Sequence, residues 1–135
     1  MAYFTGVKPG RRVIDACAGA GGKSLHLSAL MENKGKIISL DIKSNKLNEL
    51  RKRAKRANSF NIETKLINNS KVIKKLYNSA DIVLIDAPCS GIGVLKRNPD
   101  AKWKLSLDFY ERTIILQKEI SVSYTHLTLP TSVIL

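Results

Sequence analysis

The sequence predicts an α/β protein built on a doubly wound parallel sheet that is incomplete at its C-terminal end. From Val13 onward, short apolar runs typical of buried strands alternate with segments of helical periodicity. That alternation implies parallel strands joined by right-handed helical crossovers. The alternation stops after a final helix, where a further strand would be expected and none is predicted. With 135 residues the chain forms one domain at most.

Two strand–helix units are predicted in the first half of the chain. Val13–Asp15 is a short buried strand, and Lys23–Met31 is a leucine-containing helix that a Lys-Gly pair ends. Lys36–Asp41 is the second strand. Ser44–Asn58 is strongly helical, with a leucine stripe on one side and basic residues over most of the rest.

The second half continues the same order. Glu63–Ile67 is predicted as the third strand, Val72–Tyr77 as a short helix and Asp81–Ile85 as the fourth strand. Leu107–Ile120 is the last amphipathic helix, and Asp108 in its first turn complements the helix dipole.

A glycine-rich turn links the first strand to the first helix. Small residues from Ala16 to Gly22 allow a ligand to approach the backbone, and the following helix start offers unpaired N–H groups. Asp41 ends the next strand, where a carboxylate can accept both hydroxyls of a ribose. The sequence therefore predicts a Rossmann-like nucleotide-binding site; the alternative for Asp41 is a turn or capping residue before Ser44.

A phosphate-loop NTPase is a weaker alternative for the same turn. Gly22-Lys23-Ser24 matches the end of that motif, and Asp86 resembles its metal-binding carboxylate. The motif also requires a glycine five residues before Gly22, where this chain has Cys17. No metal site is predicted.

The fourth strand ends in a carboxylate and a thiol, Asp86-Ala87-Pro88-Cys89. The carboxyl ends of strands in open α/β sheets are where ligands bind. A Cys89 thiolate there could add to an electron-poor carbon or eliminate a covalent adduct. The alternative is a buried structural cysteine.

The balance of charge points to a polyanionic partner. Lys and Arg number 23 against 11 acidic residues, a formal net charge of +12, and this favours nucleic acid over a merely soluble basic surface. Lys96, Arg97, Lys102 and Trp103 follow the cysteine motif and suit phosphate contact with base stacking. The alternative is a solvated loop with Trp103 in the core.

The ends of the chain and its cysteine content suggest a cytoplasmic protein. The sequence contains no apolar stretch long enough to span a bilayer and no secretory signal pattern, and its two cysteines give no disulfide framework. The tail Ser121–Leu135 has no charged residue apart from a possible charge on His126. Val122–Thr131 can be written in codons that resemble a transposase adapter used in DNA library preparation, so residues 121–135 are expected to be a non-native tail on a partial domain at 1–120; the alternative is a genuine Thr-rich strand.

These motifs resemble the NOL/NOP/Sun family of S-adenosylmethionine-dependent RNA cytosine-5 methyltransferases, and most closely its RsmB-like branch. The resemblance extends from Val7 to Ile120 and rests on DACAGAGGK, DAPCSG and RNPDAKW in that order. It implies a class I methyltransferase core, S-adenosyl-L-methionine as cofactor, and a monomeric parent enzyme that acts on RNA, with ribosomal RNA expected.

The resemblance also implies roles for individual residues. Asp41 would hold the ribose, Asn68 stands where the family commonly has an adenine-side Asp, and Asp86 would lie near the methionine end and the target base. Cys89 would assist release of the methylated product. The residues expected along the methionine and ribose side of the cofactor are Cys17, Ala18, Gly19, Ala20, Gly21, Gly22 and Lys23.

One family motif is not found in the chain. The nucleophilic cysteine of these enzymes lies in a Thr-Cys-Ser sequence at the end of the next strand, and no such sequence occurs here. The chain is therefore expected to be an inactive fragment of an active parent. The RNA-binding domain that the resemblance leads one to expect before this domain is also missing from the fragment. The alternative is a noncatalytic RNA- or cofactor-binding module.

Overall fold

The computed structural model describes residues 2–87 and 106–134 of the chain. The chain divides into two compact units, Met1–Asp86 with Tyr124–Leu135 and Ala87–Ser123. The first unit contains the whole sheet. The described part of the second contains most of helix α5 (Leu107–Tyr124), which begins where the sequence predicts and runs four residues further.

The first unit is built on a five-stranded sheet in the order β3-β2-β1-β4-β5, in which every neighbouring pair is parallel. The predicted α/β class and parallel sheet are therefore confirmed. Each of the first four strands lies within about one residue of its predicted bounds. The strands are β1 (Arg12–Asp15), β2 (Lys36–Asp41), β3 (Ile62–Leu66), β4 (Ala80–Leu84) and β5 (Thr128–Ile134).

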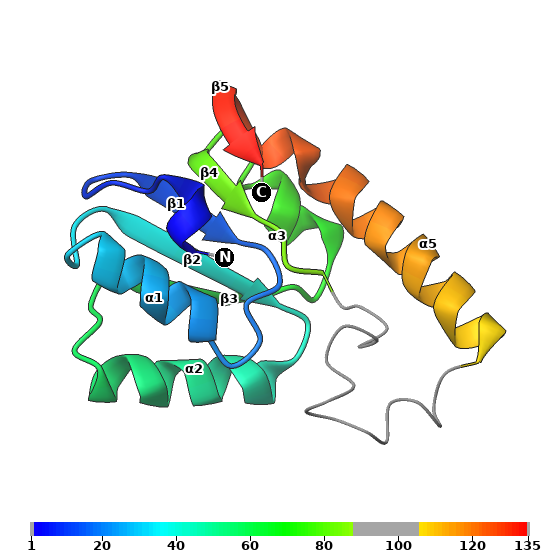
Figure 1. Cartoon of the computed structure of the whole chain (residues 1–135), viewed down its shortest axis with the longest axis horizontal. Helices are drawn as coiled ribbons and strands as arrows, with labels where there is room; N and C mark the ends of the chain where they lie inside the picture. The colour runs from blue at the N-terminus through cyan, green and yellow to red at the C-terminus, as the bar shows by residue number, and fades with distance from the viewer. Residues whose placement is uncertain (1, 88–105, 135) are drawn as a thin grey trace. The chain divides into compact units, whose positions relative to one another are not determined.

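Short helices connect the strands. Because β1, β2 and β3 follow one another across the sheet, right-handed crossovers place their connecting helices on one face, and the return from β3 to β4 places its helix on the other. Figure 1 draws α1 and α2 together on one side and α3 away from them. The helices of this unit are η1 (Ala2–Thr5), α1 (Gly22–Leu30), α2 (Ser44–Arg56), α3 (Ser70–Lys74) and η3 (Thr125–Leu127).

Helix α3 begins earlier and ends sooner than the predicted Val72–Tyr77. The Asn69 side chain accepts a hydrogen bond from the Lys71 N–H at 3.0 Å and caps the helix at its start. After Lys74 the chain tightens into turns, since Tyr77 N–H donates to Lys74 O only three residues back. Apolar spacing alone did not reveal this cap.

Strand β5 corrects the expectation that no strand follows the last helix. Thr128–Ile134 pairs with β4, so β4 is covered and is not the exposed edge that an incomplete sheet would leave. The segment contains several β-branched residues, which favour strands. Its register jumps from Thr128 to Val133 across Pro130, which has no N–H to donate to the ladder.

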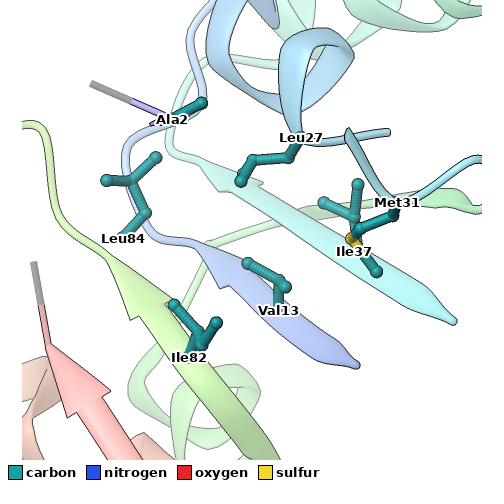
Figure 2. Close-up of a cluster of buried hydrophobic side chains, with 7 residues drawn as sticks. All are labelled: Ala2, Val13, Leu27, Met31, Ile37, Ile82 and Leu84. Atoms are coloured by element: carbon teal, nitrogen blue, oxygen red, sulfur yellow. The ribbon is translucent and has the colours of Figure 1, made fainter. Parts of the chain in front are cut away.

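The hydrophobic core lies between the sheet and α1. Figure 2 shows side chains from β1, β2 and β4 meeting Leu27 of α1 and Met31 at the C-terminal cap of that helix, with Ala2 of η1 at one end. A second cluster forms where α2 packs through Leu47, Leu50 and Ala54. These two contacts fix both helices, and with them the turn that connects β1 to α1. The residues of the first cluster are Ala2, Val13, Leu27, Met31, Ile37, Ile82 and Leu84.

Candidate functional site

The glycine-rich turn runs from the end of β1 to the start of α1 along the carboxyl edge of the sheet. Ala18 N–H donates to Leu40 O at 2.9 Å, which ties the turn to β2. Gly19 and Gly21 have φ angles of 55° and 88°, a region that favours glycine. A Cβ at Gly21 would also collide with the Leu50 side chain, so α2 packs directly against the turn.

Asp41 joins the end of β2 to this turn. Its Oδ2 accepts a hydrogen bond from Gly19 N–H at 2.9 Å, and its Oδ1 accepts one from Lys43 N–H at 2.8 Å. Asp41 is therefore a turn residue, as the alternative interpretation holds, and it also contacts the glycine-rich turn. Each carboxylate oxygen has two lone pairs, so both can still accept a hydrogen bond from a ligand.

Lys23 and Asp86 form an ion pair between the start of α1 and the residues after β4. Both side chains are more than a third exposed, so solvent reaches the pair. The neighbouring strands β1 and β4 explain the contact, because Asp15 lies in register with Leu84 and both chains leave the sheet at the same edge. The pair places a cation and a carboxylate beside the glycine-rich turn.

A buried polar cluster lies directly beneath the turn. The Ser24 hydroxyl donates to Asp15 Oδ2 at 2.7 Å and lies 2.7 Å from the Ser39 hydroxyl, so Ser39 donates to Ser24. All three residues are fully buried, and no partner within the described residues is found for Asp15 Oδ1. Sequence reasoning assigned no role to Asp15; the available signal was a carboxylate at the end of a strand whose two central residues are apolar.

Burial changes the proton affinities at this site. Burial raises the pKa of Asp15 to about 6, against the lowering effect of the Ser24 hydrogen bond and the Lys23 charge. Burial, together with the negative charges of Asp15, Asp41 and Asp86, raises the pKa of the Cys17 thiol to about 11. Cys17 is thus a neutral thiol near pH 7 and does not act as a nucleophilic thiolate there.

The structure brings together most of the residues that the sequence predicts for a cofactor site. Asn68 is exposed and follows Ile67, whose N–H donates to Asp41 O at 2.9 Å. Ala20 O accepts a hydrogen bond from Arg53 Nη1 at 3.0 Å, so a second element holds the turn. The predicted residues that lie outside the described part of the chain are Cys89, Lys96, Arg97, Lys102 and Trp103.

The described residues fit a nucleoside-bearing ligand. A Cβ added at Gly19 or Gly22 would meet nothing within 4 Å, so the backbone there faces open space. Asp41 lies at the end of the adjacent strand with its carboxylate already oriented by two N–H groups. In the described ranges no group of three or more His, Cys, Asp or Glu side chains is placed to hold a metal ion, and no helix there is long and apolar enough to cross a membrane.

The fold and this edge of the sheet define a Rossmann-like α/β domain of the methyltransferase type. Residues 2–135 match the family model for the 16S rRNA methyltransferases RsmB/F. The chain is 38% identical over 114 residues to the probable ribosomal RNA small subunit methyltransferase B of Bacillus subtilis, covering 84% of this chain and 26% of that protein. The chain belongs to the RsmB/F methyltransferase family.

Two further relatives extend the comparison. The mouse (Mus musculus) tRNA (cytosine(72)-C(5))-methyltransferase NSUN6 is 32% identical over 117 residues, covering 78% of this chain and 24% of the enzyme. The crystal structure of NSun6 from Pyrococcus horikoshii with SFG superposes with a TM-score of 0.87 at 28% identity, covering 98% of this chain and 34% of that one. The chain spans about a quarter of the length of these curated relatives. The match favours a methyltransferase over the NTPase alternative.

Proposed function

We propose that the parent of this chain transfers a methyl group from S-adenosyl-L-methionine to carbon 5 of a cytosine in RNA, with ribosomal RNA as the expected substrate. The observation that supports this most is the meeting of three strand ends at one edge of the sheet. There the glycine-rich turn after β1, Asp41 at the end of β2 and Asp86 after β4 are linked through Gly19 and Lys23. The relatives that share this domain are named as rRNA and tRNA methyltransferases.

Each part of the site would have its own task. The turn from Cys17 to Lys23 would approach the methionine and ribose, Asp41 would accept the ribose hydroxyls, and Asn68 would hydrogen-bond on the adenine side. When bound, the cofactor supplies an electrophilic methyl group. Asp86, held by Lys23, would lie beside the target base. A base must leave its stack to reach such an edge.

Cytosine chemistry explains why a thiol is needed. Carbon 5 of cytosine is a poor nucleophile until a thiolate adds at carbon 6. The chain has two cysteines, of which Cys17 is held protonated. Cys89 would assist elimination of the product, and the attacking cysteine would come from a Thr-Cys-Ser sequence that this chain does not contain. Amino-group methylation needs no thiol.

We therefore propose that the chain as given binds the cofactor weakly at most and does not turn over. Incubating it with S-adenosylmethionine, radiolabelled in its methyl group, and ribosomal RNA tests this. The full-length parent protein, expressed from its complete open reading frame, is the positive control. The parent should label cytosine and the present chain should not. Efficient labelling by the present chain would overturn the proposal that it is an inactive fragment, whereas no labelling by the parent would favour the noncatalytic binding module.

Two remaining proposals concern the setting of the protein. Residues 121–135 would be a translated adapter on a partial domain at 1–120, although in the structure part of this tail forms β5. Reading the encoding DNA tests this directly, because codons across Val122–Thr131 that differ from the adapter sequence would remove the idea. We also propose that the parent is a monomeric cytoplasmic enzyme.

A further inference from the structure

Helix α2 carries a concentration of positive charge that the proposed site does not use. It has six cations and one acid, Glu49, and it buries only Leu47, Leu50 and Ala54. The ion pairs found between described residues involve none of these cations. The cations are Lys46, Arg51, Lys52, Arg53, Lys55 and Arg56.

Two of these cations have evident structural roles. Arg53 donates to Ala20 O and holds the glycine-rich turn, and Arg51 donates to Thr64 Oγ1 at 2.7 Å and to Asn48. Lys46 lies one turn or more from the remaining three. Those three, Lys52, Lys55 and Arg56, are exposed.

Lys52, Lys55 and Arg56 form one patch, which we name the α2 basic face. They are spaced i, i+3 and i+4, so their side chains are neighbours on the solvent side of the helix, opposite the buried leucines. Like charges at this spacing oppose helix formation. The helix dipole favours cations in the last turn, but Lys52 precedes that turn. A bound polyanion would relieve the repulsion.

An exposed aromatic ring, that of Phe60, lies in the turn that follows α2. Phe60 is 80% exposed, and its backbone is fixed on both sides. The helix ends in a Schellman motif, with Asn58 at φ 51° and Ser59 N–H bonded to Ala54 O at 2.9 Å. Asn33 then accepts from Phe60 N–H and donates to Asn58 O, both at 2.9 Å. An exposed ring on an anchored turn is suited to stacking.

The α2 basic face lies away from the proposed cofactor edge. α2 starts just after Asp41 at the carboxyl edge and ends just before β3 begins, so its last turn and Phe60 lie at the amino edge (Figure 1). A helix of 13 residues is about 20 Å long. A ligand held there would extend well beyond a single target nucleotide.

We infer that the α2 basic face and Phe60 form a second RNA-binding surface, which holds single-stranded RNA by its phosphates and stacks one base, remote from the target nucleotide. The inference rests on the proposed function only in taking RNA as the polyanion. Cations beside an exposed aromatic ring are the pattern by which proteins bind single strands without reading sequence.

The test measures binding of a 5′-fluorescein-labelled twelve-nucleotide oligouridylate to this chain by fluorescence anisotropy over a series of salt concentrations. The oligouridylate has no cytosine, so recognition of a target base does not contribute. The variant K52Q/K55Q/R56Q should raise Kd about tenfold or more at low salt. It should also flatten the slope of log K against log salt by about 2, since each phosphate contact on a single strand contributes about 0.7.

A matched control removes the same charge elsewhere. K71Q/K74Q/K75Q neutralises three exposed lysines at and just after α3, on the other face of the sheet, and should change the slope much less. Phe60→Ala should raise Kd several-fold and leave the slope unchanged, because stacking releases no counterions. Circular dichroism melting of each variant checks that it is folded.

The outcomes separate this inference from the proposed function. Equal loss of slope in the α2 and α3 variants would mean that only net charge matters and would overturn the inference, as would oligouridylate binding unchanged by the α2 substitutions. Competition by polyglutamate as strong as by the unlabelled oligouridylate would overturn the choice of RNA. Cofactor binding measured by calorimetry on the same proteins tests the proposed function independently.

Discussion

Asp15 is the residue whose environment departs furthest from that of an ordinary surface carboxylate. Burial raises its pKa from 3.8 to about 6. The folded chain therefore binds more protons than the unfolded chain between these two values, so the free energy of unfolding falls as the pH rises through that window. The shift corresponds to about 3 kcal/mol lost by neutral pH.

Asp15→Asn tests this account, because the amide cannot ionise but can still accept the Ser24 hydrogen bond. The difference in unfolding free energy between the variant and the wild type should move in favour of the variant by about 2 kcal/mol from pH 4 to pH 7. Urea unfolding at several pH values measures it. A difference that stays constant with pH would show that Asp15 titrates as an ordinary carboxylate.

Asp41 offers a second test at this scale. Asp41→Ala removes the acceptor proposed for the ribose and should weaken S-adenosylmethionine binding by about 1–3 kcal/mol, the scale of a lost hydrogen-bonded partner. The matched control is Asp81→Ala. Asp81 also accepts a backbone N–H, from Arg12 at 2.8 Å, but at the amino edge of the sheet.

Calorimetry of both variants in the parent protein gives the comparison. Equal losses in Asp41→Ala and Asp81→Ala would assign the effect to the loosened backbone and would remove the ribose role.

The residues that could be predicted from the sequence were those in a motif. Gly19 and Asp86 follow strands and Asp41 ends one, so the pattern of strands sufficed to place them at one edge of the sheet. Asp15 also lies in a motif, as the first residue of DACAGAGGK, but its role could not be predicted, because it comes from a serine nine residues later and another on the next strand. The ion pair of Lys23 with Asp86 likewise depends on strand order, which places β4 beside β1.

At the scale of elements, α2 fixes the glycine-rich turn through packing and through Arg53. Gly21→Ala should lower the free energy of unfolding by about 2–4 kcal/mol. One part is the cost of a left-handed conformation for alanine, about 1–2 kcal/mol, and the rest is overpacking against Leu50. Thermal or urea unfolding measures it.

Gly22→Ala is the control for this prediction. Gly22 is the first residue of α1, and an added Cβ there meets nothing within 4 Å, so stability should be unchanged or slightly raised. Equal destabilisation by both substitutions would mean that α2 does not constrain the turn.

Element prediction succeeded where periodicity and propensity agreed, as in β2 and α2. The sequence did not predict β5, because the segment is uncharged, contains a proline and has no alternating pattern. The edge of β4 supplies what the segment lacks on its own: a row of N–H and C=O groups that any nearby extended backbone can pair with. Such pairing depends on the sheet and cannot be read from the segment alone.

At the scale of the whole molecule, the segment Thr125–Ile134 covers the edge of the sheet that β4 would otherwise expose. Leu127 is fully buried, and His126 O and Leu127 O accept the Asn78 and Ser79 N–H groups at 3.0 and 3.2 Å, just before β4. A chain ending at Tyr124 should therefore melt at a lower temperature and self-associate, because it exposes the β4 edge. Light scattering coupled to size exclusion measures the association.

The substitution Leu127→Ala separates the two effects of this truncation. It removes the buried side chain but keeps β5, so it should cost about 2–5 kcal/mol of stability without promoting association. If both proteins associate equally, the buried leucine and not the strand protects the edge. A truncated chain that stays monomeric and melts like the full chain would mean that β5 contributes nothing in solution, as expected for a tail unrelated to the domain.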